Sequence, residues 1–223
     1  MGTAHRMGKW WAVPTLQIYT LGSFHGYEED LAMPDYRRYW VPGGTYFFTL
    51  VTHQRKPLFA DVANVQRLRD ALAIVQREQP FRFLAAAVLP DHMHFLWALP
   101  TGDSAYGRRI GRMKVLFTRS LQDAGSITRA TSISRQKHRE SDFWQRRFWE
   151  HTLDNEDEMS GYLDYIHYNP VKHGWASCPH AWKASSFRQW VSRGLYELEW
   201  GCCCQGRNSS VSIPHIANQM GEP

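Results

Sequence analysis

Two histidines, His92 and His94, stand two residues apart in the apolar stretch LPDHMHFLWALP. Residues two apart on a β-strand point to the same face, so the two imidazoles would lie side by side while Met93 faces the other way. Imidazole nitrogen binds several transition metals. The pair therefore predicts half of a metal site, although two strand histidines with ordinary hydrogen bonds would give the same short pattern.

A tyrosine and an asparagine follow at helical spacing, in the stretch DYIHYNPVKHGW. An apolar stripe of helical period is made by Met159, Tyr162, Leu163 and Ile166. Tyr165 and Asn169, four residues apart, would be neighbours at one edge of this stripe. Pro170 should end or kink the helix at Asn169. The helix thus offers a phenol and an amide oxygen to one point, although surface tyrosines on an ordinary amphipathic helix would show the same spacing.

Together the two motifs predict metal-assisted chemistry. Two imidazoles and one amide oxygen make three ligands for a divalent metal, and they leave coordination positions open for substrate oxygens. A tyrosine beside such a site is a candidate nucleophile. Its phenol is weak at neutral pH, because its unperturbed pKa is about 10, but a phosphodiester polarised by a metal is a plausible target. A phosphotyrosine would keep the energy of the broken bond, so rejoining would need no nucleotide cofactor.

Six stretches of the chain resemble the single-tyrosine transposases of the HUH superfamily, and more narrowly the REP-associated tyrosine transposases. They are DYRRYW at 35–40, GGTYFFT at 43–49, LPDHMHFLWALP at 89–100, FWQRRFWEHT at 143–152, YIHYNPVKHGW at 165–175 and SSFRQWVSRGLY at 185–196. The histidine and tyrosine strings, in this order, are specific to the family. The resemblance covers most of residues 35–200.

The resemblance implies a role for each residue of the two motifs. Tyr165 would be the nucleophile, and His92, His94 and Asn169 would bind Mg²⁺ or Mn²⁺. The substrate would be single-stranded hairpin DNA of the REP type, cut to leave a 5′-phosphotyrosine and a free 3′ hydroxyl. The active unit would be a monomer or a homodimer, since related enzymes can donate the tyrosine helix to a partner subunit.

Basic residues predict where such DNA would bind. Residues 104–150 hold 11 Lys and Arg against 4 Asp and Glu, whereas the whole chain has a net charge of +5. The candidates for DNA contact are Arg108, Arg112, Lys114, Arg146, Arg147 and Lys172. The family resemblance adds Tyr36, Arg37 and Arg38, in the segment just before the first strand. A solvated helix face would explain the same charges. The aromatic residues Trp144, Phe148 and Trp149, which interleave with two of the arginines, could stack on bases or simply fill the core.

The order of apolar segments predicts an α+β fold with a ferredoxin-like βαββαβ core and an antiparallel sheet. We expect strands at 46–53, 83–89, 92–99 and 148–153, and helices at 61–78 and 104–122. The basic residues of the second helix should face outward. The histidine strand should lie inside the sheet, the two helices on one face, and the tyrosine helix is appended at the C-terminal end.

Length and composition fit one domain with tails. At 223 residues and 43% hydrophobic content the chain can bury one sizeable core. We expect a loosely ordered extension over 1–32, one transposase domain over 33–200 and a flexible tail over 201–223. No apolar run approaches the roughly 20 residues that span a membrane, so we expect no membrane partner and a place in the bacterial cytoplasm, associated with the nucleoid. The four cysteines lack the usual zinc-ligand spacing.

Two other functions remain open at this point. The chain could be a domesticated palindrome-binding protein that no longer cleaves, or a ferredoxin-like RNA-binding module without chemistry. Both would account for the basic charge and the aromatic residues. The intact set of His92, His94, Tyr165 and Asn169 argues against each of them, because a protein that only binds has no need of these four groups together.

Overall fold

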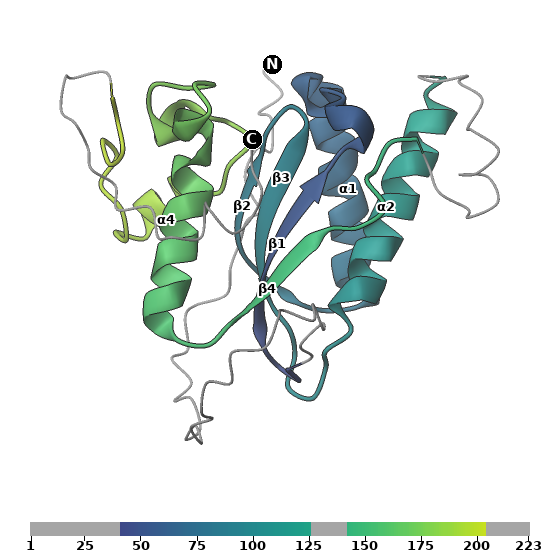
Figure 1. Ribbon diagram of the computed structural model, residues 1–223, viewed down its shortest axis with the longest axis horizontal. Helices are drawn as coiled ribbons and strands as arrows, with labels where there is room; N and C mark the ends of the chain where they lie inside the picture. Colours follow the sequence, from purple (N-terminus) through teal and green to yellow (C-terminus); the bar gives the residue numbers. More distant parts are fainter. Residues whose placement is uncertain (1–40, 126–141, 204–223) are drawn as a thin grey trace, which may run out of the picture.

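The computed structural model describes residues 41–125 and 142–203, which build an antiparallel sheet with helices on both faces (Figure 1). Its strands are β1 (Thr45–Val51), β2 (Arg82–Val88), β3 (His92–Ala98) and β4 (Trp149–Leu153), in the order β2-β3-β1-β4. Helices α1 (Val62–Glu78) and α2 (Tyr106–Asp123) complete the chain order βαββαβ. The predicted α+β fold is confirmed, and β3, which carries the two histidines, is an interior strand as expected.

Alternation along the strands buries both faces of the sheet. On β1, Tyr46 and Phe48 lie in the core that α1 and α2 cover. Phe47, between them, lies in a second core with Tyr162 and Tyr165 of helix α4 (Glu156–Lys172). Figure 1 shows α1 and α2 on one side of the sheet and α4 on the other. Two helices therefore share one face, as expected, and the appended tyrosine helix covers the opposite face.

Local signals account for where α4 begins, but not for where it ends. Asn155 caps the helix, since its Oδ1 accepts from the backbone N of Glu158 at 2.8 Å. Acidic residues in the first turn suit the positive end of the helix dipole. Of the expected end or kink at Asn169, the end is wrong, because the helix runs on to Lys172 with Pro170 inside it. Helical hydrogen bonding continues beyond the proline, since His173 N donates to Asn169 O at 3.1 Å.

The chain that follows α4 covers the edge strand β2. Ser186 N donates to Ala86 O at 2.9 Å, and Val88 N donates to Ala184 O at 2.8 Å. This satisfies edge groups that would otherwise be open to another strand. The remaining short elements are η1 (His53–Arg55), η2 (Leu58–Ala60), η3 (Pro179–Ala181) and α5 (Phe187–Ser192). Within the described ranges, no helix is long and apolar enough to cross a membrane.

The predicted domain boundaries fall largely outside the described residues. The extension over 1–32 lies outside them, as does the tail from residue 204 onward. Gly201 and Cys202 are described and are buried, so packed structure reaches into the start of the segment expected to be a flexible tail. The boundaries at 32 and 200 stay predictions.

Arg109 departs from the expected outward-facing basic surface of α2. It is only 2% exposed. Its guanidinium contacts Asp103 at 2.6 and 3.1 Å and donates to the backbone oxygens of Gln79 and Pro80 at 3.2 and 2.8 Å. Arg109 therefore ties the start of α2 to the end of α1. The sequence could not reveal this, because the carbonyl acceptors are 29 and 30 residues away.

Replacing Arg109 with Met should lower the free energy of unfolding by about 2–4 kcal/mol, because two carbonyl oxygens and one carboxylate lose a charged donor. Urea unfolding would measure the loss. The matched control is Arg112→Met on the same helix, where an ion pair with Glu78 is about one-third exposed on both sides. That control should cost much less, because a solvent-exposed ion pair contributes little to stability. Equal losses in the two variants would contradict a structural role for Arg109.

Candidate active site

Strand β3 fixes the two histidines on the face that α4 covers. Met93 and Phe95 are fully buried against the opposite face of the sheet. His92 and His94 alternate with them, are 4% and 0% exposed, and have ring centroids 5.1 Å apart. The expected side-by-side arrangement is present, while the role of the pair as metal ligands stays a prediction.

A hydrogen bond orients each imidazole through its Nδ1 atom. His94 Nδ1 lies 3.0 Å from Thr49 Oγ1 on the neighbouring strand β1. His92 Nδ1 lies 2.7 Å from Asp91 Oδ1. Partial burial alone would raise the pKa of Asp91, but hydrogen bonds and charges from His92 and Arg55 outweigh it and lower that pKa. Metal-binding histidines commonly use one ring nitrogen in this way, so Nε2 of each ring is the nitrogen that would bind a metal if the prediction holds.

One face of α4 lines up with the two histidines. Tyr165, Asn169 and His173 follow one another at intervals of four residues, and such residues are neighbours on a helix. The Tyr165 ring is 5.2 Å from the His94 ring, and the His173 ring is 5.3 Å from the His92 ring. Asn169 lies between these two contacts along the helix, on the same helix face as the residues that approach the histidine pair.

The Asn169 side chain supports a metal at this point. It is fully buried, and neither its Oδ1 nor its Nδ2 has a hydrogen-bond partner within the described part of the chain. A buried amide without partners is costly unless an ion or a ligand satisfies it. Two oriented imidazoles beside an amide oxygen are a donor set that fits Mg²⁺ or Mn²⁺ as well as softer divalent metals. The residues present therefore fit the predicted cofactor.

The three tyrosines of α4 occupy different surroundings. Tyr162 packs on Phe47, with ring centroids 4.6 Å apart, and burial followed by the charge of Glu158 raises the pKa of its phenol. Tyr168 lies against Trp200 of the C-terminal segment, with ring centroids 6.3 Å apart. Tyr165 is the one whose ring contacts a histidine of the pair, and it is 1% exposed. This burial differs from the surface position that an ordinary amphipathic helix would give it.

Comparison with known proteins identifies the family. A family model described as "Transposase IS200 like" matches residues 41–169, a range that begins just before β1 and ends at Asn169. A protein of Haemophilus influenzae (strain Rd), named as a REP-associated tyrosine transposase, is 42% identical over 170 residues, which cover 76% of this chain and 94% of that protein. The chain belongs to the REP-associated tyrosine transposases. The expectation drawn from its motifs is confirmed.

Two further comparisons agree with this assignment. A REP-associated tyrosine transposase of Escherichia coli (strain K12) is 38% identical over 168 residues, covering 75% of this chain and 91% of that protein. A solved structure described as a REP-associated tyrosine transposase bound to a REP hairpin is 38% identical, covers 75% of this chain and 91% of its own, and superposes with a TM-score of 0.63. As a tyrosine transposase, the chain is an enzyme that cuts and joins DNA. HUH transposases generally use a divalent metal.

Three residues of the transposase site were not singled out as site residues from the sequence. Thr49 is brought to His94 by strand pairing, and nothing in the sequence reveals which residue lies opposite. Asp91 stands directly before His92 in the motif, so its proximity could have been noticed. His173 is four residues beyond Asn169, so the same helical spacing that links Tyr165 to Asn169 could have found it.

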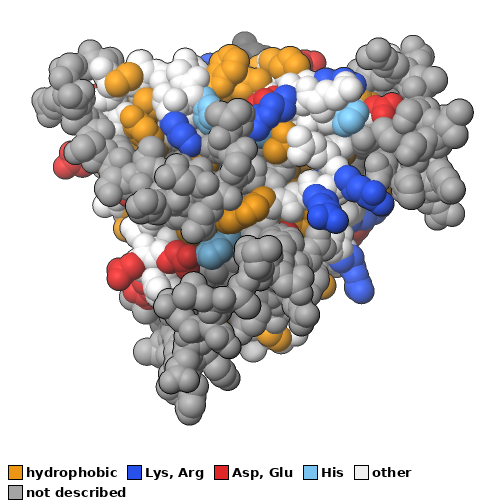
Figure 2. Space-filling model, viewed as in Figure 1, with side chains coloured by type: hydrophobic (Ala, Val, Ile, Leu, Met, Phe, Trp, Pro, Cys, Tyr) orange, Lys and Arg blue, Asp and Glu red, His pale blue; other side chains and the backbone are white. Residues whose placement is uncertain are grey.

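Eight of the nine predicted DNA contacts divide into three groups, and Lys172 is described separately below. Arg108, Arg146 and Arg147 are exposed. Arg112 and Lys114 are engaged within the protein, the first in a two-point ion pair with Glu78 at 2.8 Å. Tyr36, Arg37 and Arg38 lie outside the described residues. Figure 2 shows Lys and Arg side chains gathered over α2 and the segment leading into β4, and acidic side chains near the start of α4. All of these contacts stay predictions.

Lys114 and Lys172 both lie over aromatic rings. Lys114 Nζ is 5.5 and 5.6 Å from the ring centroids of Trp144 and Phe148, and desolvation lowers the pKa of Lys114 to about 8. Trp144 is 4% exposed and Phe148 packs on the same core, so these aromatic residues are core residues and not an open stacking surface. Lys172 Nζ lies 5.2 Å from the Tyr165 ring centroid, which brings a positive charge to the candidate nucleophile.

Replacing Thr49 with Val should weaken metal binding at the histidine pair by about 10–100-fold, because His94 loses the hydroxyl that orients its ring. Titration with Mn²⁺ in a calorimeter would measure the affinity. Thr49→Ser keeps the hydroxyl and should retain most of it. An unchanged Mn²⁺ affinity in Thr49→Val would contradict either the orienting role of Thr49 or the assignment of His94 as a ligand.

Proposed function

We propose that this transposase is a metal-dependent single-stranded DNA endonuclease and strand transferase in which Tyr165 forms a 5′-phosphotyrosine at hairpin DNA. The observation that carries the proposal is the approach of Tyr165 to His94 on a helix face that also presents the buried Asn169. A nucleophile and three metal donors of mixed type are thereby directed to one small volume. A protein that only binds DNA would have no reason to bury these four polar groups together.

The proposed cleavage is a direct displacement at phosphorus. The Tyr165 oxygen forms a new bond to phosphorus while the bond from phosphorus to the 3′ oxygen breaks. The phenolic proton is released, and the departing oxygen takes up a proton to become the 3′ hydroxyl. Because the phosphodiester is replaced by a phosphotyrosine ester, a 3′ hydroxyl can later attack the same phosphorus and restore a DNA strand without an added energy source.

Each group near Tyr165 has a separate part in this step. His92 and His94, oriented by Asp91 and Thr49, would hold the metal together with Asn169. The bound Mg²⁺ or Mn²⁺ would polarise the phosphate and stabilise charge on the departing oxygen. The Lys172 ammonium beside the Tyr165 ring would favour the phenolate form and attract the phosphate.

The proposed substrate is single-stranded hairpin DNA. The solved relative is described as bound to a REP hairpin, and the exposed basic residues of this chain supply charge complementary to a phosphate backbone. Tyr165 and His94 of the same chain meet, which supports a monomer as the active unit over a homodimer that exchanges tyrosine helices. The bacterial sources of the relatives and a DNA substrate support a place in the cytoplasm, with the nucleoid.

Tyr165→Phe should abolish the covalent adduct while leaving hairpin binding near normal, because one oxygen is removed and the ring is kept. The measurement is a denaturing gel after incubation with Mn²⁺ and a labelled single-stranded hairpin. The matched control is Tyr168→Phe, which removes the same atom one turn away and should retain the adduct. His94→Ala should also lose the adduct but keep binding. Adduct formation by Tyr165→Phe, or peptide mapping of the DNA to Tyr168, would refute the proposed nucleophile.

Arg108→Ala and Arg146→Ala should each reduce the salt dependence of hairpin binding. If each side chain neutralises one phosphate, the slope of log affinity against log salt should become shallower by about 0.7 per arginine for a single strand. Fluorescence anisotropy at several salt concentrations would measure this at pH 7, where Lys114 is still mainly protonated. Arg112→Ala should have a smaller effect, since Glu78 already neutralises that charge.

Lys183→Ala is the control for these variants, because Lys183 is exposed on the segment beyond α4 that covers the β2 edge. It removes one positive charge from outside the proposed DNA-binding surface and should leave the slope unchanged. Identical slopes for the wild type, Arg108→Ala and Arg146→Ala would show that these arginines form an ordinary solvated face.

A further inference from the structure

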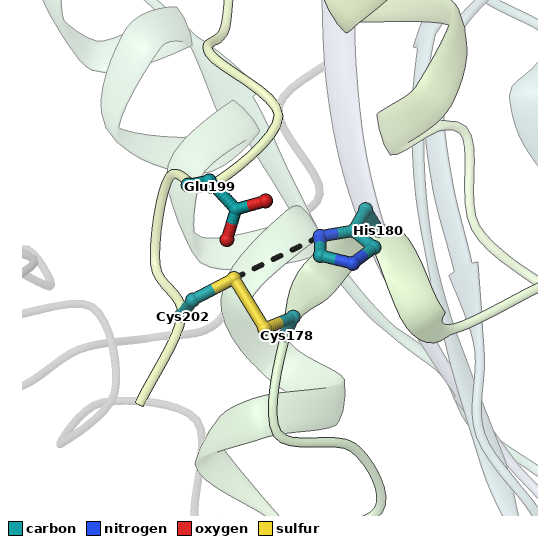
Figure 3. Close-up of side chains that lie close together, drawn as sticks. All are labelled: Cys178, His180, Glu199 and Cys202. Atoms are coloured by element: carbon teal, nitrogen blue, oxygen red, sulfur yellow. Dashed lines mark hydrogen bonds between the residues drawn. A yellow bond between two sulfur atoms is a disulfide. The ribbon is translucent and has the colours of Figure 1, made fainter. Parts of the chain in front are cut away.

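Two segments that are distant in the sequence bring four metal-binding side chains together on the far side of α4 from the sheet. Cys178 and His180 come from the turn after α4, and Glu199 and Cys202 from the C-terminal end of the described chain (Figure 3). One donor atom from each side chain can be chosen so that all four lie within 4.8 Å of one another. We call this group the C-terminal cluster. The structure joins its two sulfurs in a disulfide.

The backbone holds these two segments in place independently of the sulfur atoms. Cys203 N donates to Ser177 O at 2.9 Å, so the segments are already paired next to the cluster. Gly201 adopts a positive φ of 69°, and a Cβ there would come within 3.1 Å of the side chains of Pro179 and Tyr168. Only glycine suits this backbone and this close approach. The cysteines are therefore brought together by a defined turn and not by a chance encounter of two tails.

The donor types in the cluster suit zinc. Thiolate sulfur, imidazole nitrogen and carboxylate oxygen are the ligands of four-coordinate zinc sites, whereas Mg²⁺ and Mn²⁺ prefer oxygen. Cys178 and Cys202 are both 4% exposed, and His180 is half-buried. In Figure 3 the His180 ring and the Glu199 carboxylate approach the Cys202 sulfur from different sides, with His180 Nδ1 3.7 Å from that sulfur. The cluster thus offers two sulfurs, one nitrogen and one oxygen.

We propose that, when Cys178 and Cys202 are thiols, the C-terminal cluster binds one structural Zn²⁺ ion that clamps the C-terminal segment onto α4. This zinc site would be separate from the predicted metal site at the histidine pair. Its ligands include sulfur, and it would prefer zinc over Mg²⁺ or Mn²⁺. It also changes the interpretation of the cysteines, whose spacing in the sequence does not indicate a zinc site.

The change from disulfide to zinc site is balanced in electrons and protons. A dithiol reductant delivers two electrons and two protons to the Cys178–Cys202 bond and is itself oxidised to a disulfide, leaving two thiols. Zinc binding then displaces the two thiol protons. His180 Nδ1 lies 3.0 Å from Leu198 O, so this nitrogen must give up any proton shared with that carbonyl before it binds zinc. A reducing cytoplasm, which we proposed above as the location, would favour the thiol form.

The position of the cluster indicates what the ion would stabilise. Trp200, two residues before Cys202, contacts Tyr168 of α4 with ring centroids 6.3 Å apart. Tyr196 donates to Asp164 of the same helix at 2.5 Å. The C-terminal segment therefore lies along the outer surface of the helix whose inner surface carries Tyr165. An ion that closes this 24-residue loop would restrict the outward movement of α4.

Metal analysis of the reduced full-length chain tests the proposal. The His92→Ala, His94→Ala double variant, prepared with a phosphine reductant, removes the histidine pair as a competing site. It should contain one zinc per chain. Cobalt exchanged into it should show thiolate-to-cobalt charge-transfer absorption. Adding Cys202→Ser should remove both signals, whereas adding Cys203→Ser should keep them, because Cys203 is exposed and its thiol contacts Ser177 O outside the cluster.

A second variant distinguishes loss of a zinc ligand from misfolding of the chain. Glu199 is exposed, so Glu199→Gln should fold normally while it weakens zinc affinity at least about tenfold. Competition with a chromophoric chelator would measure this affinity. A zinc-specific chelator should also lower the melting temperature of the reduced wild type but not that of the oxidised protein. Absence of zinc in the reduced double variant, or loss of zinc in Cys203→Ser with retention in Cys202→Ser, would overturn the proposal. Because the readouts are metal content and melting temperature, they are independent of whether Tyr165 cleaves DNA.

Discussion

Packing of α4 on the second face of the sheet is the constraint on which the site depends. The two interior strands, β1 and β3, place large apolar residues on both faces, and α1 and α2 cover only one of them. Phe47 fills the other face, with Tyr162 and Tyr165 of α4 at ring-centroid distances of 4.6 and 5.9 Å. Burial of these rings positions the helix, since each aromatic side chain removes a large apolar area from water. His92 and His94 lie on the same face, so the contact that completes the core also closes the site.

This arrangement buries one polar side chain, that of Asn169, in the core between α4 and the sheet. Asn169 is fully buried and its amide finds no partner among the described residues, while Tyr165 beside it lies in the apolar cluster. Such a group weakens a fold unless a ligand satisfies it, because its lost hydrogen bonds to water are not replaced. The oriented imidazoles opposite would supply the rest of the proposed donor set. A buried polar group that breaks the local rules of stability is expected at a functional site.

Periodic features of the chain were predictable, and contacts between distant segments were not. Alternation fixed the directions of His92, Met93 and His94, and the 3.6-residue period fixed the helix face of Tyr165 and Asn169. Both rules depend only on local backbone geometry. The partner of His94 depends on the register of β1 against β3, and the burial of Arg109 depends on carbonyls at the far end of α1. The helix runs through Pro170, which local sequence rules alone would not predict.

His167 shows that α4 is tied to the sheet at its edge as well as over its face. Its Nε2 lies 2.8 Å from Ser186 Oγ, and the same oxygen accepts from Ala86 N of β2 at 2.9 Å. Complete burial lowers the pKa of His167 to about 3, so the ring is neutral at physiological pH. The hydrogen bond between His167 and Ser186 is therefore one between two uncharged groups. Ser186 belongs to the segment that pairs with β2, and this segment continues into the C-terminal turn that covers the outer surface of α4. The sheet therefore contacts the inner surface of α4, and the chain that follows α4 contacts the helix both at the β2 edge and on its outer surface. This explains how a tyrosine on an appended helix can be kept in register with two histidines on an interior strand.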